Sequence, residues 1–430
     1  MTARIVSVHG RQILDSRGRP TVEVDVALDD GTLGRASVPS GASTGSSEAV
    51  ELRDADPDDY AGLGVRKAVL HVNGEIAEAL CGANPLDQQG LDSRLIRMDG
   101  TAQLGRLGAN AILGCSLAIA RAAATTRKIP LYEYIHSLAA GDALSLPMPM
   151  VNILSGGLHA GRGMDVQDFL AIPSSATSIE EAIRNVVRVR AAAAELLADR
   201  GMSTLLADEG GLSPGFQTPR EALQLMVDAM EQAGFRAGVD MTIAIDVAAT
   251  ALYDRGTCDY DLRREGRRAS SADMIAMVKD WIDDFPVVSV EDALDEEDWR
   301  GWRTLTQELG SRVRLVGDDL FTTNSERLSR GIRERCANGV LVKLNQNGTL
   351  SGTLQVIADA KRNGFAPIVS ARSGETEDSF IADLAVGTAA GQIKIGSVRC
   401  SDRLAKYNQL IRIEERSGAR FAGMSSVRLA

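Results

Sequence analysis

The start of the chain shows two kinds of hydrophobic spacing. Residues 22–28 place valine or leucine at every second position, and after an Asp-Gly turn a second apolar stretch covers 33–38. This pattern predicts a β-hairpin. Residues 65–80 and 109–124 instead carry apolar side chains at helical spacing. We therefore expect an α+β N-terminal domain at residues 1–140.

Beyond this region, short apolar runs alternate with amphipathic segments. The stretch 141–149 contains two prolines and is interpreted as a linker. Capping boxes that begin at Ser178 and Thr218 predict two helices. The apolar runs are 205–207, 242–245, 287–290, 313–316, 340–342 and 367–369. Apolar strands separated by helices are typical of a parallel sheet covered on both faces, and the length suits a β/α barrel at residues 141–430.

Composition narrows the class of partner. The 430 residues include 47 basic and 58 acidic side chains, a formal net charge of −11, which argues against nucleic acid or an anionic membrane. We find no apolar stretch near the roughly 20 residues of a membrane span and no signal-peptide core. The five cysteines are scattered without a CxxC motif, as expected for reduced thiols. We predict a cytoplasmic protein.

Acidic residues follow three of the predicted strands. Asp246 and Glu291 come directly after their strands, and Asp318 follows its strand after one glycine. In a barrel the strand ends converge at one mouth, where active sites of this fold lie. Carboxylates gathered there need a cation, and an all-oxygen set favours Mg²⁺ or Mn²⁺. The alternative, solvated loop acids or helix caps, suits a single acid better than three at successive strand ends.

Three other residues near the predicted strand ends are candidates for a functional role. Lys343 ends the next strand, and a desolvated lysine near a cation can act as a base, although it could equally pair with a carboxylate. Glu209 follows the run 205–207 and is a candidate proton donor or a cap. His159 lies in a glycine-rich loop after a barrel strand, where a functional role is favoured over packing.

Two further features suit an anionic substrate. The segment 38–48 is small and polar, and is either a plain inter-domain loop or a lid that meets a metal or phosphate. Arg372 and Ser373 follow the strand at 367–369, and Lys394 lies in a later apolar segment. The cationic side chains supply the charge that such a substrate needs.

Taken in order, these residues resemble the enolase (phosphopyruvate hydratase) family, essentially from end to end. The motifs that carry the resemblance are 15–23, 40–45, 208–211, 244–248, 289–292, 316–319, 342–346, 372–378 and 404–410. The resemblance implies an α+β N-terminal cap on a modified TIM-type β/α barrel whose second strand is antiparallel. It also implies a homodimer or homo-octamer.

The resemblance assigns a role to each candidate residue. Two Mg²⁺ ions are implied, the first held by Asp246, Glu291 and Asp318, the second bound with phosphate and involving Ser40. Lys343 would remove the C2 proton, and Glu209 would protonate the leaving C3 hydroxyl. The substrate-binding set would be Arg372, Ser373 and Lys394, with His159, Gln167 and Asp168 nearby.

The sequence departs from the family pattern at two of these positions. Asp168 stands where enolases carry glutamate, and Ala371 stands where they carry histidine. Aspartate is one methylene shorter, which retracts the carboxylate by roughly 1.5 Å, and a misplacement of about 1 Å can cost on the order of 100-fold in rate. Both positions surround the leaving hydroxyl, whereas the metal and base positions match the family.

Three functions follow from this pattern. We predict a Mg²⁺-dependent enolase-type lyase that removes the C2 proton of 2-phosphoglycerate, or a close analogue, to form an enolpyruvyl product such as phosphoenolpyruvate. The alternative is an enolase paralogue of phosphonate metabolism, such as carboxyphosphonoenolpyruvate synthase, with altered leaving-group chemistry. Either would bind a small phosphorylated or phosphonylated carboxylate. A non-catalytic binding protein is disfavoured, because Asp246, Glu291, Asp318 and Lys343 are all present.

Overall fold

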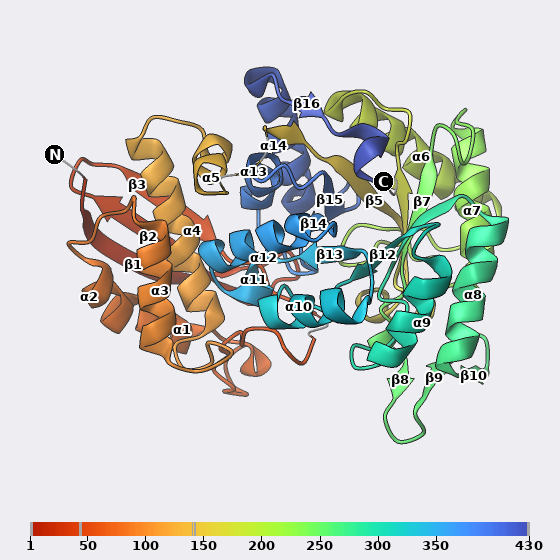
Figure 1. Cartoon of the computed structure of the whole chain (residues 1–430), viewed down its shortest axis with the longest axis horizontal. Coiled ribbons are helices and arrows are strands. Elements are labelled where there is room, and N and C mark those ends of the chain that lie inside the picture. The colour runs from red at the N-terminus through yellow and green to blue at the C-terminus, as the bar shows by residue number, and fades with distance from the viewer. Residues whose placement is uncertain (1–2, 43–44, 140, 142, 428–430) are drawn as a thin grey trace.

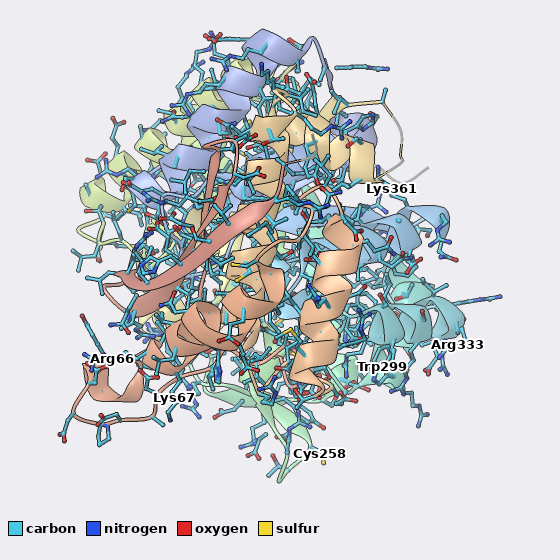
Figure 2. All side chains as sticks on the ribbon, turned by 90° about the vertical axis from the view of Figure 1, so that its left-hand side faces the viewer. Arg66, Lys67, Cys258, Trp299, Arg333 and Lys361 are labelled. Carbon is cyan, nitrogen blue, oxygen red and sulfur yellow. The ribbon has the colours of Figure 1, made fainter. Side chains whose placement is uncertain are left out.

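The computed structural model describes residues 3–42, 45–139, 141 and 143–427. A small α+β unit lies beside a larger barrel, at the left and right of Figure 1 respectively. Figure 2 views the molecule from the N-terminal side, with Arg66 and Lys67 on the nearer unit and Arg333 on the barrel side. No helix of the described chain is both long enough and apolar enough to cross a membrane.

The N-terminal unit is an antiparallel sheet covered by helices. Its strands are β1 (Ile5–Leu14), β2 (Pro20–Leu28) and β3 (Leu33–Ser37), in that order. The predicted hairpin is confirmed, because β2 pairs with β3 and its inward valines are buried. The 18-residue helix α4 (Ala109–Thr126) packs on β2 and β3. Gly34 allows this approach, since a Cβ there would lie 2.2 Å from the carbonyl oxygen of Ala118.

The predicted helix at 65–80 is present but interrupted. It divides into α1 (Arg66–His71), a π-helical turn (Val72–Ile76) and α2 (Ala77–Leu80). The side chain of Asn73 in this turn exchanges hydrogen bonds of 2.7 and 3.0 Å with the backbone of Gly10 on β1. This tie between helix and sheet accompanies the break in the regular spacing. The remaining helices of the unit are α3 (Gln88–Asp99) and α5 (Leu131–Ala139).

The second unit is a closed eight-stranded barrel, as predicted. Its strands are β5 (Met148–Ser155), β6 (Asp168–Ile172), β7 (Thr242–Asp246), β11 (Val287–Glu291), β12 (Arg314–Gly317), β13 (Gly339–Val342), β14 (Ala366–Ser370) and β15 (Gln392–Gly396). Strand β6 is antiparallel to both neighbours, β5 and β7, and the other barrel pairs are parallel. The antiparallel second strand implied by the family resemblance is therefore present.

Helices surround this barrel. They are α6 (Ile179–Asp199), α7 (Pro219–Gln232), α8 (Ser271–Asp284), α9 (Trp299–Leu309), α10 (Ser325–Glu334), α11 (Leu344–Asn347), α12 (Leu350–Arg362), α13 (Phe380–Gly387) and α14 (Ser401–Ser417). The capping box at Thr218 is confirmed. At Ser178 only half of the box forms, because the carboxylate of Glu181 bonds Thr177 instead.

Two sequence-based expectations for the barrel are wrong. Residues 205–207 form no barrel strand: Leu206 makes an isolated bridge to Leu212, and Leu205 is 75% exposed. The barrel positions are filled instead by β5 and β6, so residues 148 and 149 of the predicted linker belong to a strand. Part of that linker also forms β4 (Ser145–Leu146), which pairs with β16 (Arg420–Phe421).

The short hairpin strands β8 (Tyr253–Asp254), β9 (Asp259–Leu262) and β10 (Arg267–Ala269) project from the barrel at the lower right of Figure 1. Single 3₁₀ turns occur at Tyr60–Gly62, Leu158–Ala160, Ala249–Ala251 and Gly423–Ser426.

Candidate active site

Three carboxylates meet at the barrel mouth because their strands end there. Asp246 is the last residue of β7 and Glu291 the last of β11, and the parallel register pairs the two directly. Asp318 follows β12, the next strand around the barrel. The three side chains are buried. The strands are buried because they are apolar. The polar residue at the end of each strand therefore lies at the edge of the core.

Two lysines balance these acids. Lys394 Nζ on β15 donates to Asp246 Oδ2 at 2.6 Å and to Glu291 Oε1 at 2.8 Å. Lys343, immediately after β13, pairs with Asp318. Burial opposes charge on both ammonium groups, but the neighbouring carboxylates outweigh it and raise both pKa values. Both lysines are therefore protonated as long as they are the cations that neutralise these carboxylates.

The donor chemistry of this cluster fits a hard cation. Burial raises the pKa of Glu291 well above its usual range, and the nearby charges of Asp246 and Asp318 add to the effect. Such a set is short of positive charge, and all of its donors are oxygen, which Mg²⁺ prefers.

A second group of acids lies alongside this set. Asp292, Asp318 and Asp319 each place one oxygen within 4.8 Å of the others. The Asp292 carboxylate, however, accepts the backbone N–H groups of Asp318 (2.9 Å) and Asp319 (2.8 Å). Asp292 therefore positions the end of β12, and Asp318 is the member of the group that also faces Lys343.

The side of the mouth next to β7 is built on the antiparallel strand β6. Its direction places its first residue, Asp168, beside Ser155 and Asp246. Asp168 Oδ1 accepts a hydrogen bond from Ser155 Oγ at 2.7 Å and lies 3.3 Å from His159 Nε2. Burial lowers the pKa of His159, but the Asp168 carboxylate outweighs it and raises that pKa to about 9. Asp168 Oδ2 is buried and has no hydrogen-bond partner among the described residues.

Glu209 completes this side from the loop after α6. Its carboxylate accepts hydrogen bonds from Ser373 Oγ at 3.3 Å and from Asn152 Nδ2 at 3.4 Å. Burial raises the pKa of Glu209, but Arg403, His159 and other cations outweigh it and lower that pKa to about 2. Sequence reasoning did not single out Asn152. Its signal was a lone amide in the otherwise apolar interior of β5.

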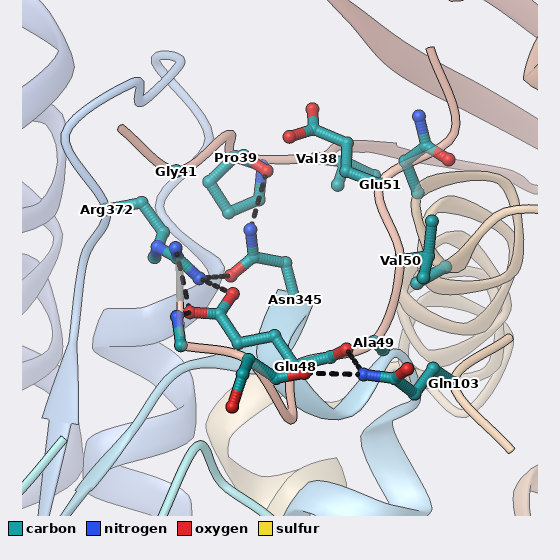
Figure 3. Close-up of a pocket in the computed structure, with 14 residues that line it drawn as sticks. Val38, Pro39, Gly41, Glu48, Ala49, Val50, Glu51, Gln103, Asn345 and Arg372 are labelled. Carbon is teal, nitrogen blue, oxygen red and sulfur yellow. Dashed lines mark hydrogen bonds and ion pairs between the residues drawn. The ribbon is translucent and has the colours of Figure 1, made fainter. Parts of the chain in front are cut away.

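The N-terminal unit contributes a carboxylate that sequence reasoning also missed. Glu48 pairs with the Arg372 guanidinium at 2.8 and 3.3 Å, and Arg372 Nη1 also donates to Asn345 Oδ1 at 3.0 Å (Figure 3). Gln346 Nε2 bridges Glu48 (3.3 Å) and Asp318 (2.8 Å). Glu48, Asn345 and Arg372 line a pocket of about 450 Å³ between the two units. Ser43 and Thr44 of the predicted lid lie outside the described residues.

Ser40 and Gln167 differ in their position relative to the three strand-end acids. The Ser40 hydroxyl donates to Glu51 at 3.1 Å and accepts from Arg53 at 2.7 Å, so its side-chain bonds are made away from the three strand-end acids. Its backbone pairs with Gly374 of the loop after β14. Gln167 Nε2 donates to Asp246 Oδ2 at 3.2 Å and so joins the mouth.

Two family models match the chain. The enolase N-terminal domain matches residues 5–135, and the enolase C-terminal TIM barrel domain matches residues 143–429. The matches coincide with the α+β unit and the barrel, and they leave only the chain ends and a seven-residue junction, 136–142, uncovered. The chain belongs to the enolase family.

Proposed function

We propose that this enolase-superfamily lyase is Mg²⁺-dependent and removes the C2 proton of 2-phosphoglycerate, or a close analogue, to give an enolpyruvyl product. The observation that carries the proposal is the gathering of three buried carboxylates at one barrel mouth, where Lys343 pairs with one of them, Asp318. A proton beside a carboxylate is very weakly acidic, so its removal needs both a base and strong stabilisation of the resulting charge.

The residues of the mouth divide this work. Asp246, Glu291 and Asp318 would hold Mg²⁺, which supplies the positive charge that stabilises a dianionic product of proton loss. Lys343 acts as the base once it is a neutral amine, which requires that it no longer share its proton with Asp318. A second Mg²⁺ at Ser40 is also proposed, and would require the Ser40 hydroxyl oxygen to give up the hydrogen bond that it accepts from Arg53.

Substrate binding is assigned to two cations, Arg372 in the loop after β14 and Lys394 on β15. Arg372 presents a planar fork suited to phosphate or carboxylate, and Lys394 presents a point charge beside the acids. Ser373 adds a hydroxyl that already bonds Glu209. Arg372 is paired with Glu48, so an anionic substrate has to share or replace that partner.

One observation favours the alternative of altered leaving-group chemistry. Departure of the C3 hydroxyl needs a proton donor, yet Glu209, with a pKa of about 2, is ionised in the free protein. The proton on this side resides on His159, which is held by Asp168. Ala371 contributes no polar side chain there. A paralogue such as carboxyphosphonoenolpyruvate synthase, which needs enolate chemistry on a related substrate, fits this arrangement.

An isotope experiment tests both functions. The protein is incubated with 2-phosphoglycerate and Mg²⁺ in deuterated water, and C2 exchange and phosphoenolpyruvate formation are followed separately. Full turnover supports the dehydratase, and exchange without dehydration supports the alternative. Lys343→Met is the control, because it removes the base while retaining an unbranched apolar stem. If the wild-type protein exchanges no C2 proton, or if the variant exchanges as fast, the proposed chemistry on this substrate is wrong.

We also propose that the enzyme is a homodimer, which could in turn assemble into an octamer. Two neighbouring grooves of about 460 and 640 Å³ share Arg35 and Arg121 in their walls. The first is also lined by Arg412 and Arg416, and the second by several acids that include Glu377. A basic groove beside an acidic one on the same face is self-complementary across a two-fold axis.

All five cysteines are free, which supports the proposed cytoplasmic location.

A further inference from the structure

Helix α14 buries three large polar side chains on one face. Arg403, Lys406 and Tyr407 are each no more than 1% exposed. They are three and four positions apart, so they lie on the same side of the helix. Burying an arginine and a lysine is costly unless their N–H groups are hydrogen-bonded. The partners of these groups therefore show what the helix holds in place.

Arg403 holds the backbone of the anion-binding residues. Its Nη1 donates to the carbonyl oxygens of Arg372 (2.6 Å) and Ile395 (2.9 Å), and its Nη2 donates to that of Ser373 (2.7 Å). Ile395 is the neighbour of Lys394. One rigid guanidinium thus fixes the chain at the ends of both β14 and β15, from which Arg372, Ser373 and Lys394 extend.

The loop that carries Glu209 meets the same point. Gly396 has φ +108°, and a Cβ there would lie 2.9 Å from the Glu209 carbonyl oxygen and 3.1 Å from Arg403 Cδ. The Ser397 N–H donates to the Glu209 carbonyl at 2.9 Å. The Tyr407 hydroxyl donates to the Gly396 carbonyl at 2.8 Å. Three loops of the barrel mouth therefore converge on the face of α14 that Arg403 and Tyr407 occupy.

We propose that Arg403 is a positioning residue: by holding the carbonyls of Arg372, Ser373 and Ile395, it sets the geometry with which the enzyme binds its anionic substrate. The idea rests on the proposed function only in assigning those residues to substrate binding. Arg403 acts through the backbone, and its charge also helps to keep Glu209 ionised. Lys343 is outside this network, because it follows β13 and pairs with Asp318.

The main test variant is Arg403→Lys. It keeps the charge, but a single ammonium group cannot reproduce a fork that reaches three carbonyls. We expect KM for 2-phosphoglycerate to rise by about 10- to 100-fold, since displacements near 1 Å have effects of this order. The rate constant of C2 exchange at saturation should change by less than about threefold, because a misplaced binding group lost equally from ground and transition states alters KM alone.

Lys406→Met is the matched control. Lys406 is equally buried on the same helix, but it bonds Glu375 (3.0 Å) and the Thr376 carbonyl (2.5 Å), and it reaches the Arg372 backbone only through Glu375, which accepts the Arg372 N–H. A purely structural loss lowers the folded fraction and hence the apparent kcat, and it leaves KM unchanged. If Arg403→Lys shows that pattern, or raises KM no more than Lys406→Met does, the proposal is overturned.

Hydrogen–deuterium exchange separates this proposal from the proposed function. Arg403→Lys should speed amide exchange at 371–376 and 395–397 while the rest of the chain keeps its protection, whether or not the wild-type protein turns over 2-phosphoglycerate. Tyr407→Phe, which frees only the Gly396 carbonyl, should speed exchange at 395–397 and serves if Arg403→Lys does not fold. Unchanged protection in both loops would contradict the positioning role even if the enzyme proves active. An absence of C2 exchange in the wild-type protein would instead count against the function alone.

Discussion

Removal of the Lys394 ammonium tests how the acids of the mouth are balanced. In the variant Lys394→Met, Asp246 and Glu291 lose the cation that lies 2.6 and 2.8 Å from them. At an effective dielectric constant of about 20, each contact has a Coulomb energy of about 6 kcal/mol, against a desolvation cost of several kcal/mol for the buried ammonium. Removing one partner of a buried ion pair typically costs about 3–5 kcal/mol, and we expect a loss of that size in the free energy of unfolding.

Magnesium should offset much of this loss. If Mg²⁺ binds these carboxylates, a concentration of 100 times Kd adds about 2.7 kcal/mol to stability. The variant should gain more than the wild-type protein, because its acids no longer share their charge with Lys394. Urea unfolding followed by circular dichroism, with Mg²⁺ or with EDTA, measures both differences.

Lys406→Met again supplies the control. It removes an equally buried lysine whose partner, Glu375, is not one of the strand-end acids. This variant should be destabilised in EDTA without a specific rescue by Mg²⁺. Lys394 does not balance a Mg²⁺-binding set of acids if Mg²⁺ stabilises both variants equally, or if it stabilises Lys394→Met no more than the wild-type protein.

Three further predictions concern other parts of the molecule. Combining Asp168→Glu with Ala371→His should raise phosphoenolpyruvate formation about 10- to 100-fold relative to C2 exchange, and an unchanged ratio would show that these positions do not limit dehydration. Burial raises the pKa of Asp383 to about 6, so the wild-type protein binds an extra proton when folded and loses stability as the pH rises from about 4 through 6. Asp383→Asn should remove that loss and be more stable at pH 8 by up to about 3 kcal/mol, as checked by urea unfolding at pH 4 and 8. Arg412→Glu should weaken the proposed dimer at least about tenfold in sedimentation equilibrium, and adding Glu377→Arg should restore it if the grooves face each other.

The strand-end acids could be predicted from the sequence because their positions follow a local pattern. An apolar run followed by an acid, as at Asp246 and Glu291, reports both the buried strand and the residue at its open end. The same rule failed at 205–207, where three apolar residues belong to a loop that leaves Leu205 exposed. A three-residue run is too short to distinguish a strand from a loop by periodicity. Strand β6 was recovered only through family resemblance, since its direction is set by its neighbours.

The ion pairs of the mouth could not be predicted from a local sequence pattern. Lys394 is 148 residues from Asp246, and Arg372 is 324 residues from Glu48. Such partners are brought together by barrel closure and by the packing of the N-terminal unit on it, which no local pattern encodes. The sequence indicated cations for a substrate, whereas the structure shows that internal carboxylates already occupy them. The role of Arg403 was hidden for a similar reason, because its partners are backbone carbonyls that leave no trace in the sequence.

The free-energy cost of burying ionisable groups bears on whether the side of the mouth that carries Asp168 and Ala371 has lost its catalytic function. Asp168 and His159 are buried together, and Glu209 is kept ionised in the interior by surrounding cations. Buried charge pairs are often no more stabilising than apolar residues of similar volume, so a protein that served only as a binding scaffold would gain nothing by keeping them. The buried Asp168 oxygen, which has no hydrogen-bond partner in the described part of the chain, is a further cost of about 1–3 kcal/mol. Such costs are expected where ionisable groups work on a substrate, which favours a lyase with modified leaving-group chemistry over a protein that has lost catalysis.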